Sequence, residues 1–284
     1  MMRGMGWLAR LSLHYTQEHR NGTAHTSAHD RHEGPLRVLQ RLYPEGPGIC
    51  HHVLVHPPGG VVGGDELRLD LQLDAGAHAV VTTPGATRFY RSEGAPALQH
   101  TSLRVAEGAR LEWLPLETIA YSGCRAANSV TAELAPGAEM MGWDVLTLGL
   151  PAAGQPFQTG VFTQQLEQPG QWLERGCLAA DDHTLLHGPV GWAGHTVSAT
   201  LWFAAGAAFS AARRTALLDA ARGCIDGHAL AATAGATAPQ TTVVLVRVLA
   251  GRVEPVMQLL AAVRAAWRLQ EWGLAAAPPR VWKT

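Results

Sequence analysis

The segment from Cys50 to His56 (CHHVLVH) carries the side chains best suited to holding a metal ion. If the segment forms a strand, alternation places Cys50, His52 and His56 on one face. Thiol and imidazole ligands on one face suit nickel, copper or zinc, so a metal-dependent hydrolase using these three residues is one hypothesis. The alternative is a strand that enters a turn with incidental histidines. We favour this alternative, because ligands must converge and need supporting hydrogen bonds.

A second histidine pair, His183 and His187, has an i,i+4 spacing that converges on a metal only on a helix. Gly188-Pro189 follows at once and no glutamate follows His183, so the metalloprotease signature is absent and we predict a solvated turn. The histidines at 14, 19, 25, 29 and 32 fall mostly in the stretch 17–33, which has no apolar period. We predict an exposed loop there, with weak surface metal binding as the alternative to ordinary polar residues.

Four carboxylates lie within or beside apolar segments: Asp65, Glu112, Glu117 and Asp144. A buried carboxylate is costly unless it is paired or bound to a cation. Two interpretations therefore stay open. The carboxylates line a polar internal path, or they have arginine partners such as Arg88 or Arg125.

The run from Pro57 to Asp65 (PPGGVVGGD) lacks the GxGxxG order and opens no helix, which argues against dinucleotide binding. Its four glycines indicate close backbone packing or positive φ angles. The only lysine is Lys283, next to the C-terminus, so the body of the chain offers neither a P-loop nor a Schiff-base lysine. The sequence also contains no GxSxG motif, which would indicate a nucleophilic serine.

Composition excludes further classes of function. With 47% apolar residues among 284, the chain can bury a sizeable core, and a net charge of -1 gives no field for nucleic acid. No apolar stretch reaches the roughly 20 residues of a membrane span, and no secretory signal is evident, so we expect a cytoplasmic protein. The four cysteines are too dispersed for a disulfide framework or a four-thiolate zinc site: Cys50, Cys124, Cys177 and Cys224.

The elements that must position these residues are mainly strands. Leucines at 67, 69, 71 and 73 alternate with polar residues, and a turn at Gly76 leads into the apolar run 79–81. This strand-turn-strand frame recurs at 103–114 and 132–143, with looser copies centred on Gly170 and Gly206. The turn glycines are thus spaced by 32, 29, 33 and 36 residues. Such a period is typical of stacked supersecondary units.

Strand alternation also marks 7–15, and β-branched residues mark 241–249. Helical patterns occur only late, over Ser210–Arg222 and Glu254–Trp272. No linker-like shift in composition divides the chain. We therefore predict a mainly β, solenoid-like stack of strand-turn-strand units with two α-helices in the C-terminal third, forming one domain over 1–284.

Several short motifs are spread from residue 34 to the C-terminus. Their key residues are His56, Gly59, Gly60, Gly63, Gly64, Asp65, Phe89, Tyr90, Arg91, Ser92, Glu117, Trp143, Pro279, Arg280 and Trp282. Together they resemble, nearly end to end, the urease accessory proteins called UreD, or UreH in some organisms. Two departures are Leu116, where the family often has a glutamine, and Leu150, where an arginine often precedes the proline.

The resemblance implies a mainly β, solenoid-like fold with no catalytic activity and no resident cofactor. It implies a complex with UreF and the GTPase UreG, contact with apo-urease, and an internal passage for Ni²⁺. By family analogy we expect Asp65, Glu117 and Asp144 to line or gate that passage through oxygen ligands. A purely structural solenoid without a metal role is the remaining alternative, and it would need another partner.

Overall fold

The computed structural model describes residues 6–283. Eighteen strands and three α-helices form in that range. The strands are β1 (Leu8–Arg20), β2 (Thr23–Glu33), β3 (Arg37–Val38), β4 (Ile49–Val55), β5 (Glu66–Leu73), β6 (His78–Thr82), β7 (Thr87–Phe89), β8 (Ala97–Val105), β9 (Arg110–Leu114), β10 (Thr118–Ala120), β11 (Arg125–Leu134), β12 (Glu139–Leu150), β13 (Gln155–Pro156), β14 (Val161–Gln168), β15 (Trp172–Ala179), β16 (Val197–Ala205), β17 (Ala234–Gln240) and β18 (Val243–Ala250). The helices are α1 (His183–His187), α2 (Ala211–Asp226) and α3 (Val253–Trp272).

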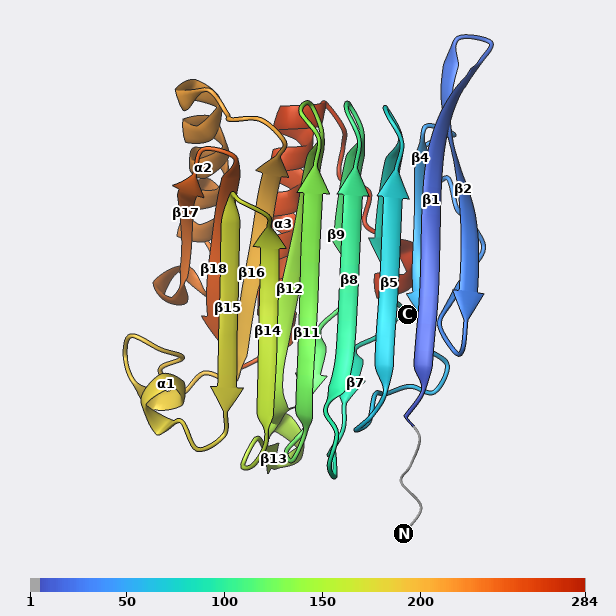
Figure 1. Ribbon diagram of the computed structural model, residues 1–284. Coiled ribbons are helices and arrows are strands. Elements are labelled where there is room, and N and C mark those ends of the chain that lie inside the picture. The colour runs from blue at the N-terminus through green and yellow to red at the C-terminus, as the bar shows by residue number, and fades with distance from the viewer. Residues whose placement is uncertain (1–5, 284) are drawn as a thin grey trace.

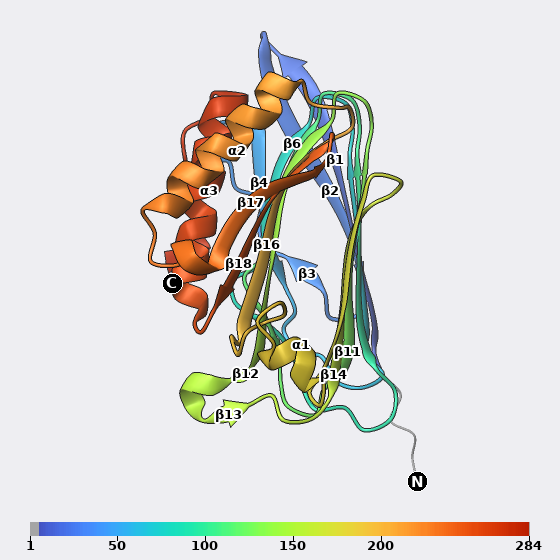
Figure 2. The ribbon, with the colours of Figure 1, turned by 90° about the vertical axis from the view of Figure 1, so that its left-hand side faces the viewer.

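The strands form two sheets that face each other (Figure 1). The first sheet has the order β15-β14-β11-β8-β5-β1-β2, and the main path of the second is β17-β18-β16-β12-β9-β6-β4-β3. Helices α2 and α3 cover the outer face of the second sheet, which lies between them and the first sheet (Figure 2). Among residues 6–283, no helix lies over the outer face of the first sheet.

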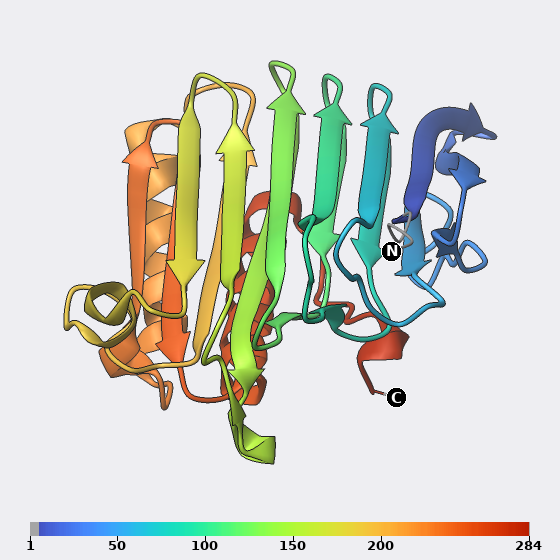
Figure 3. The same ribbon diagram turned by 60° about the horizontal axis from the view of Figure 1, so that its bottom comes forward.

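Each of the three predicted strand-turn-strand units at Gly76, Gly108 and Gly137 is one coil of a solenoid. Its first strand lies in the first sheet and its second strand in the second sheet, as in β5 and β6, β8 and β9, and β11 and β12. Successive coils therefore pair in parallel within each sheet. The turn glycines Gly76, Gly108 and Gly137 all have positive φ, a conformation that suits glycine. These three turns lie in a row at one end of the molecule (Figure 3).

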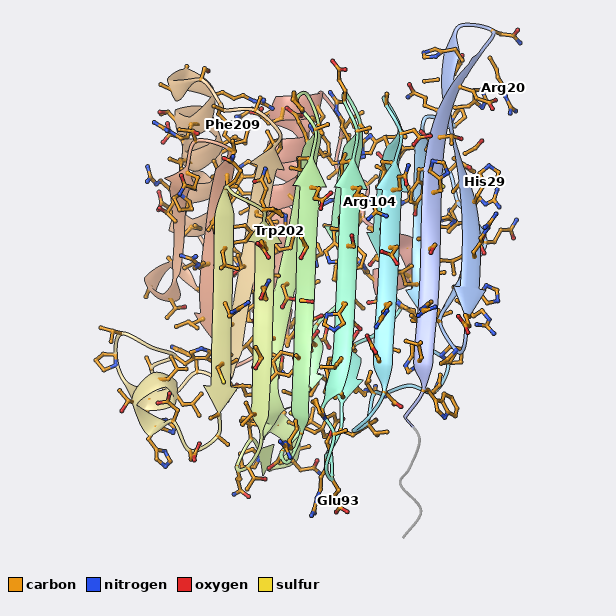
Figure 4. The ribbon with its side chains drawn as sticks, in the orientation of Figure 1. Arg20, His29, Glu93, Arg104, Trp202 and Phe209 are labelled. Carbon is orange, nitrogen blue, oxygen red and sulfur yellow. The ribbon has the colours of Figure 1, made fainter. Side chains whose placement is uncertain are left out.

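Burial follows the two-layer arrangement. Strand β5 alternates buried leucines with exposed or half-buried polar residues, because its outer face meets solvent. Figure 4 shows Arg104 and other polar side chains along the first sheet. Strand β12 is buried at every position from Met140 to Gly149, because it packs on the first sheet on one side and on helices on the other. Two apolar cores result, one between the sheets and one beneath the helices.

The structure confirms the fold class and corrects four local predictions. The stretch 17–33 is not a loop, because β1 continues to Arg20 and β2 begins at Thr23. The two strands pair over their length around Asn21-Gly22, both with positive φ. Asn-Gly is a strong hairpin signal that polar, histidine-rich flanks obscured.

Three later segments also differ from the predictions. Gly170 does turn one strand into the next, but β14 and β15 are antiparallel neighbours in the same sheet. Gly206 ends β16 and leads to α2, which begins after the N-cap Ser210, so no second strand follows it. The segment from His183 to His187 is a helix rather than a solvated turn, because Asp182 caps it.

None of the helices within 6–283 has the length and apolarity needed to cross a bilayer.

Candidate functional site

A cavity of about 280 Å³ opens at the end of the molecule opposite the glycine turns. The starts of β5 and β8 and the segments that follow β4, β6 and β9 line it. The lining includes His56, Gly60, Arg88, Gln99 and Trp113. Because Gln99 lies on the inner face of β8, the cavity connects this end of the molecule with the space between the two sheets.

Three amide side chains continue inward from the cavity along the first sheet. Gln99, Asn128 and Gln164 are neighbours in register on β8, β11 and β14. In-register parallel strands place equivalent residues side by side, so a polar residue at one inward position can extend into a row. Gln99 Nε2 donates to Asn128 Oδ1 at 3.2 Å, which joins the first two members.

Asp144, on β12 of the facing sheet, accepts hydrogen bonds from two of these amides. Asn128 Nδ2 donates to Asp144 Oδ2 at 3.1 Å, and Gln164 Nε2 donates to Asp144 Oδ1. Burial raises the pKa of Asp144 to about 7, and the charge of Glu174 acts in the same direction against the two amide hydrogen bonds. Among the described residues Asp144 has no ion-pair partner. This carboxylate thus lies in the interior without a compensating cation.

The polar residues continue along the second sheet toward its other side. Asp144, Thr200 and Arg247 are in register on β12, β16 and β18. From the opposite sheet, Glu174 accepts from Thr200 Oγ1 at 2.9 Å and from Arg247 Nε at 3.0 Å. The side chain of Arg247 is half exposed. We call the whole set the polar row: Gln99, Asn128, Gln164, Asp144, Glu174, Thr200 and Arg247.

Two of the three predicted path residues, Asp65 and Glu117, lie next to segments that line the cavity, but they do not line it themselves and are outside the polar row. Asp65 holds a turn, because its carboxylate accepts from the main-chain nitrogens of Val62 at 3.0 Å and Trp7 at 2.9 Å. Glu117 lies half-buried between β9 and β10, and its main-chain oxygen accepts from the nitrogen of Thr87, a cavity residue. Only Asp144 lies deep between the sheets.

The cysteine and histidine candidates separate into two places. Cys50 and His52 share the inner face of β4, where His52 Nδ1 and the Tyr15 hydroxyl are 2.8 Å apart. Burial raises the pKa of Cys50 to about 11 and lowers that of His52 to about 4. His56 follows the end of β4 and lines the cavity instead. Within residues 6–283 no three or more His, Cys, Asp or Glu side chains gather in a way that could hold a metal ion.

Glu112 has arginine partners, but not those considered from the sequence. Its carboxylate is fully buried and pairs with Arg264 at 2.5 Å and Arg268 at 3.0 Å, both on α3. His78 Nε2 adds a third contact at 3.2 Å. Burial alone would raise the pKa of Glu112, but His78 and the two guanidiniums lower it to about 2. Glu112 therefore ties α3 to the second sheet and is separate from the polar row.

Comparison with known proteins identifies the family. The model of the UreD urease accessory protein family matches residues 8–283. The chain belongs to this family. It is 60% identical to the urease accessory protein UreD of Leptothrix cholodnii over 99% of this chain and 100% of that protein. It is also 60% identical to the UreD protein of Verminephrobacter eiseniae, over 98% of this chain and 99% of that protein. With the UreD protein of Variovorax paradoxus it shares 57% identity, over 99% of this chain and 100% of that protein.

The glycines of the UreD motif allow close packing beside the cavity. A Cβ atom on Gly60 would lie 2.1 Å from the ring of Tyr90, and one on Gly63 would lie 2.7 Å from the main-chain oxygen of Ala95. Gly59 and Gly64 have positive φ. The predicted close packing and positive φ angles are both confirmed, and they fix the segment against the one that follows β7.

The remaining UreD motif residues are mostly structural in their contacts. Phe89 packs edge-on against Phe162, Ser92 is buried, and Arg91 forms an exposed pair with Glu93. In the C-terminal motif Pro279 is buried and Arg280 exposed. The ring centroids of Trp143 and Trp282 are 5.3 Å apart, and Trp282 Nε1 donates to Thr82 Oγ1 at 2.8 Å. The C-terminal segment is thereby fastened to β6 next to the cavity.

Most members of the polar row escaped sequence analysis, although a signal for them exists. In β11 the inward positions are Ala126, Asn128, Val130 and Ala132, so Asn128 is the polar exception on an apolar face. Thr200 interrupts buried apolar residues of β16 in the same way. The alternation of inward and outward side chains along a strand identifies such exceptions. It does not tell which of them meet across two sheets.

Proposed function

We propose that this protein acts in the maturation of urease as a non-catalytic scaffold. It would work in the cytoplasm with UreF and the GTPase UreG and assist nickel insertion into apo-urease. Membership of the UreD family carries the proposal, because relatives that span nearly the same length are urease accessory proteins. The absence of a P-loop lysine fits a division of labour in which GTP hydrolysis belongs to a partner.

We further propose that Ni²⁺ passes between the sheets along the polar row. Asp144 supports this step, because a buried carboxylate without a cation partner is a place where a passing divalent cation would be stabilised. Amide, hydroxyl and carboxylate oxygens are hard ligands that hold nickel weakly and release it readily. Asp65 and Glu117 would act at the cavity, where the ion would enter or leave.

Co-expression of apo-urease with UreF and UreG tests both steps. Nickel content and urea hydrolysis of the purified urease are measured without this chain, with the wild type, and with Asp144→Ala, Asp65→Ala or Glu117→Ala. Asp70→Asn is the matched control, because Asp70 lies on a strand of the same sandwich but outside the polar row. We expect activation to depend on the chain, to fall in the three alanine variants and to be unchanged in the control.

The outcomes separate the two steps. Full activation without the chain would contradict the scaffold role. Activation that needs the chain but is the same in all three alanine variants, present at wild-type amounts, would retain the scaffold and reject the passage. We do not propose the metal-dependent hydrolase, because Cys50 and His52 lie apart from His56 and no observation favours that function.

A further inference from the structure

Helix α1 carries two histidines that the proposed function leaves without a role. His183 and His187 are exposed and stand one turn apart on the same side of the helix. Their rings are stacked, with centroids 5.8 Å apart and planes inclined by 20°. In the described part of the chain neither ring makes a hydrogen bond or an ion pair with the protein. Both imidazoles are therefore available to a ligand from solvent.

The helix is only one turn long, but its ends are well held. Asp182 accepts from the nitrogen of Leu185 at 2.9 Å at the N-terminus. At the C-terminus the nitrogen of Gly188 donates to the oxygen of Thr184 at 3.0 Å. An isolated turn of this length would be unstable in water, so its persistence depends on the surrounding structure.

The segment after α1 folds back and locks it in place. The nitrogen of Trp192 donates to the oxygen of Leu185 at 2.8 Å, and that of Gly194 donates to the oxygen of Leu186 at 2.8 Å. Leu186 and Trp192 are buried in the core between the sheets. Figure 2 shows α1 at the edge of the sandwich, between the two sheets. The backbone that carries the two imidazoles is thus fixed before any ligand arrives.

We propose that His183 and His187 form a binding site for one divalent transition-metal ion of the type that prefers imidazole, such as Ni²⁺. Two histidines at i,i+4 on a helix face can ligate the same ion, since four residues separate them by only about 6 Å along the axis. Imidazole nitrogen suits nickel, copper and zinc. Asp181, next to the capping Asp182, adds negative charge nearby without a role as ligand.

Two protein ligands leave the other coordination positions to water. The site would therefore hold its ion weakly and exchange it readily, unlike a closed structural site. A second histidine pair provides a comparison. His14 and His29 are opposite each other on β1 and β2, but His14 is engaged with Asp74 at 2.9 Å. The stacked pair on α1 is the better chelate, because no carboxylate in the described part of the chain pairs with either of its rings.

Calorimetric titration of the untagged full-length chain with NiCl₂ in a non-coordinating buffer tests the site. The variants are His183→Gln, His187→Gln and the double variant, with His29→Gln as the matched control. We expect one equivalent of Ni²⁺ in the wild type and the control. Either single variant should bind this equivalent roughly 100-fold more weakly, since each removes the chelate, and the double variant should be no worse than either single variant.

A second measurement reports on the helix itself. Ni²⁺ bound across one turn should slow hydrogen exchange of the Gly188 amide, whose hydrogen bond closes that turn, in the wild type but not in His187→Gln. Equal nickel binding in all variants would refute the site. So would the loss of half of the bound nickel in each single variant, because the two histidines would then bind separately. The site does not rest on the nickel passage proposed above. Asp144→Asn should retain it even if that passage fails.

Discussion

Two buried carboxyl groups in this protein have opposite electrostatic character. Glu112 and Asp144 are both buried, yet the pKa is about 2 for the first and about 7 for the second. Burial favours the neutral acid in both cases. The difference lies in the neighbours. Glu112 faces two guanidiniums and a histidine, whereas Asp144 accepts from two amides and lies near the like charge of Glu174.

The raised pKa of Asp144 predicts a pH dependence of stability. In the unfolded chain the pKa of Asp144 returns to about 3.9. Between about pH 4 and 7 the folded state therefore holds a proton on Asp144 that the unfolded state has lost. The contribution of Asp144 to stability is therefore fully present below pH 4 and is lost as the pH rises through 7. The loss amounts to about 4 kcal/mol at most, from about 1.4 kcal/mol per pH unit.

Urea denaturation of the wild type and Asp144→Asn across pH 4–8 measures this effect. The free-energy difference between the two proteins should shift with pH in favour of the variant as the pH rises. Subtracting the two curves removes groups common to both, including His52, whose lowered pKa of about 4 acts in the opposite direction. A difference that stays constant with pH would contradict the buried, uncompensated carboxylate.

At the scale of elements, helix α3 depends on a buried ion-pair cluster. Glu112→Gln would leave Arg264 and Arg268 buried without a full counter-charge, which typically costs roughly 3–5 kcal/mol. Thermal unfolding measures the loss. Glu93→Gln is the control, because its pair with Arg91 is exposed and contributes little. Equal stability of the Glu112 variant and this control would show that α3 is held by apolar packing alone.

The glycine turns between coils predict a second effect at this scale. Gly108 has φ +67° with no atom closer than 3.9 Å to an added Cβ, so Gly108→Ala is strained only in its backbone. The expected cost is about 1–2 kcal/mol. Gly176→Ala is the matched control, since it lies in β15 with open space and no positive φ, and should be neutral or slightly stabilising. Chemical denaturation compares the two variants, and equal midpoints would refute the conformational argument.

How much of each element the sequence predicts depends on local signals. The alternation in 67–73 and the turn at Gly76 predict β5 and β6 because both are local patterns. Strand β2 was missed because its register comes from β1 and its polar face resembles a loop, although Asn21-Gly22 marks the hairpin. The cluster at Glu112 could not be predicted, since Arg264 lies 152 positions away in the sequence.

For the whole molecule, the second sheet joins two cores. Met140 on β12 packs between the sheets, and its neighbour Met141 packs beneath the helices. The repeat predicts the stacking of coils, and the family resemblance predicts the same architecture. Neither predicts that Asp144 meets amides from two strands of the facing sheet, because that contact depends on how the sheets are placed against each other. The candidate site is therefore less predictable than the fold that carries it.

The shared sheet predicts that the whole chain unfolds as a single domain. Loss of either core removes one packed face from β12, β16 and β18, so neither layer should persist without the other. Far-ultraviolet circular dichroism, which reports α2 and α3, and tryptophan fluorescence should give one coincident transition. Leu71→Ala between the sheets and Leu260→Ala beneath the helices should each shift that transition, by roughly 2–5 kcal/mol. If Leu260→Ala lowered only the helical signal and left a folded sandwich, the helices would form a separate cooperative unit and the single-domain prediction would be wrong.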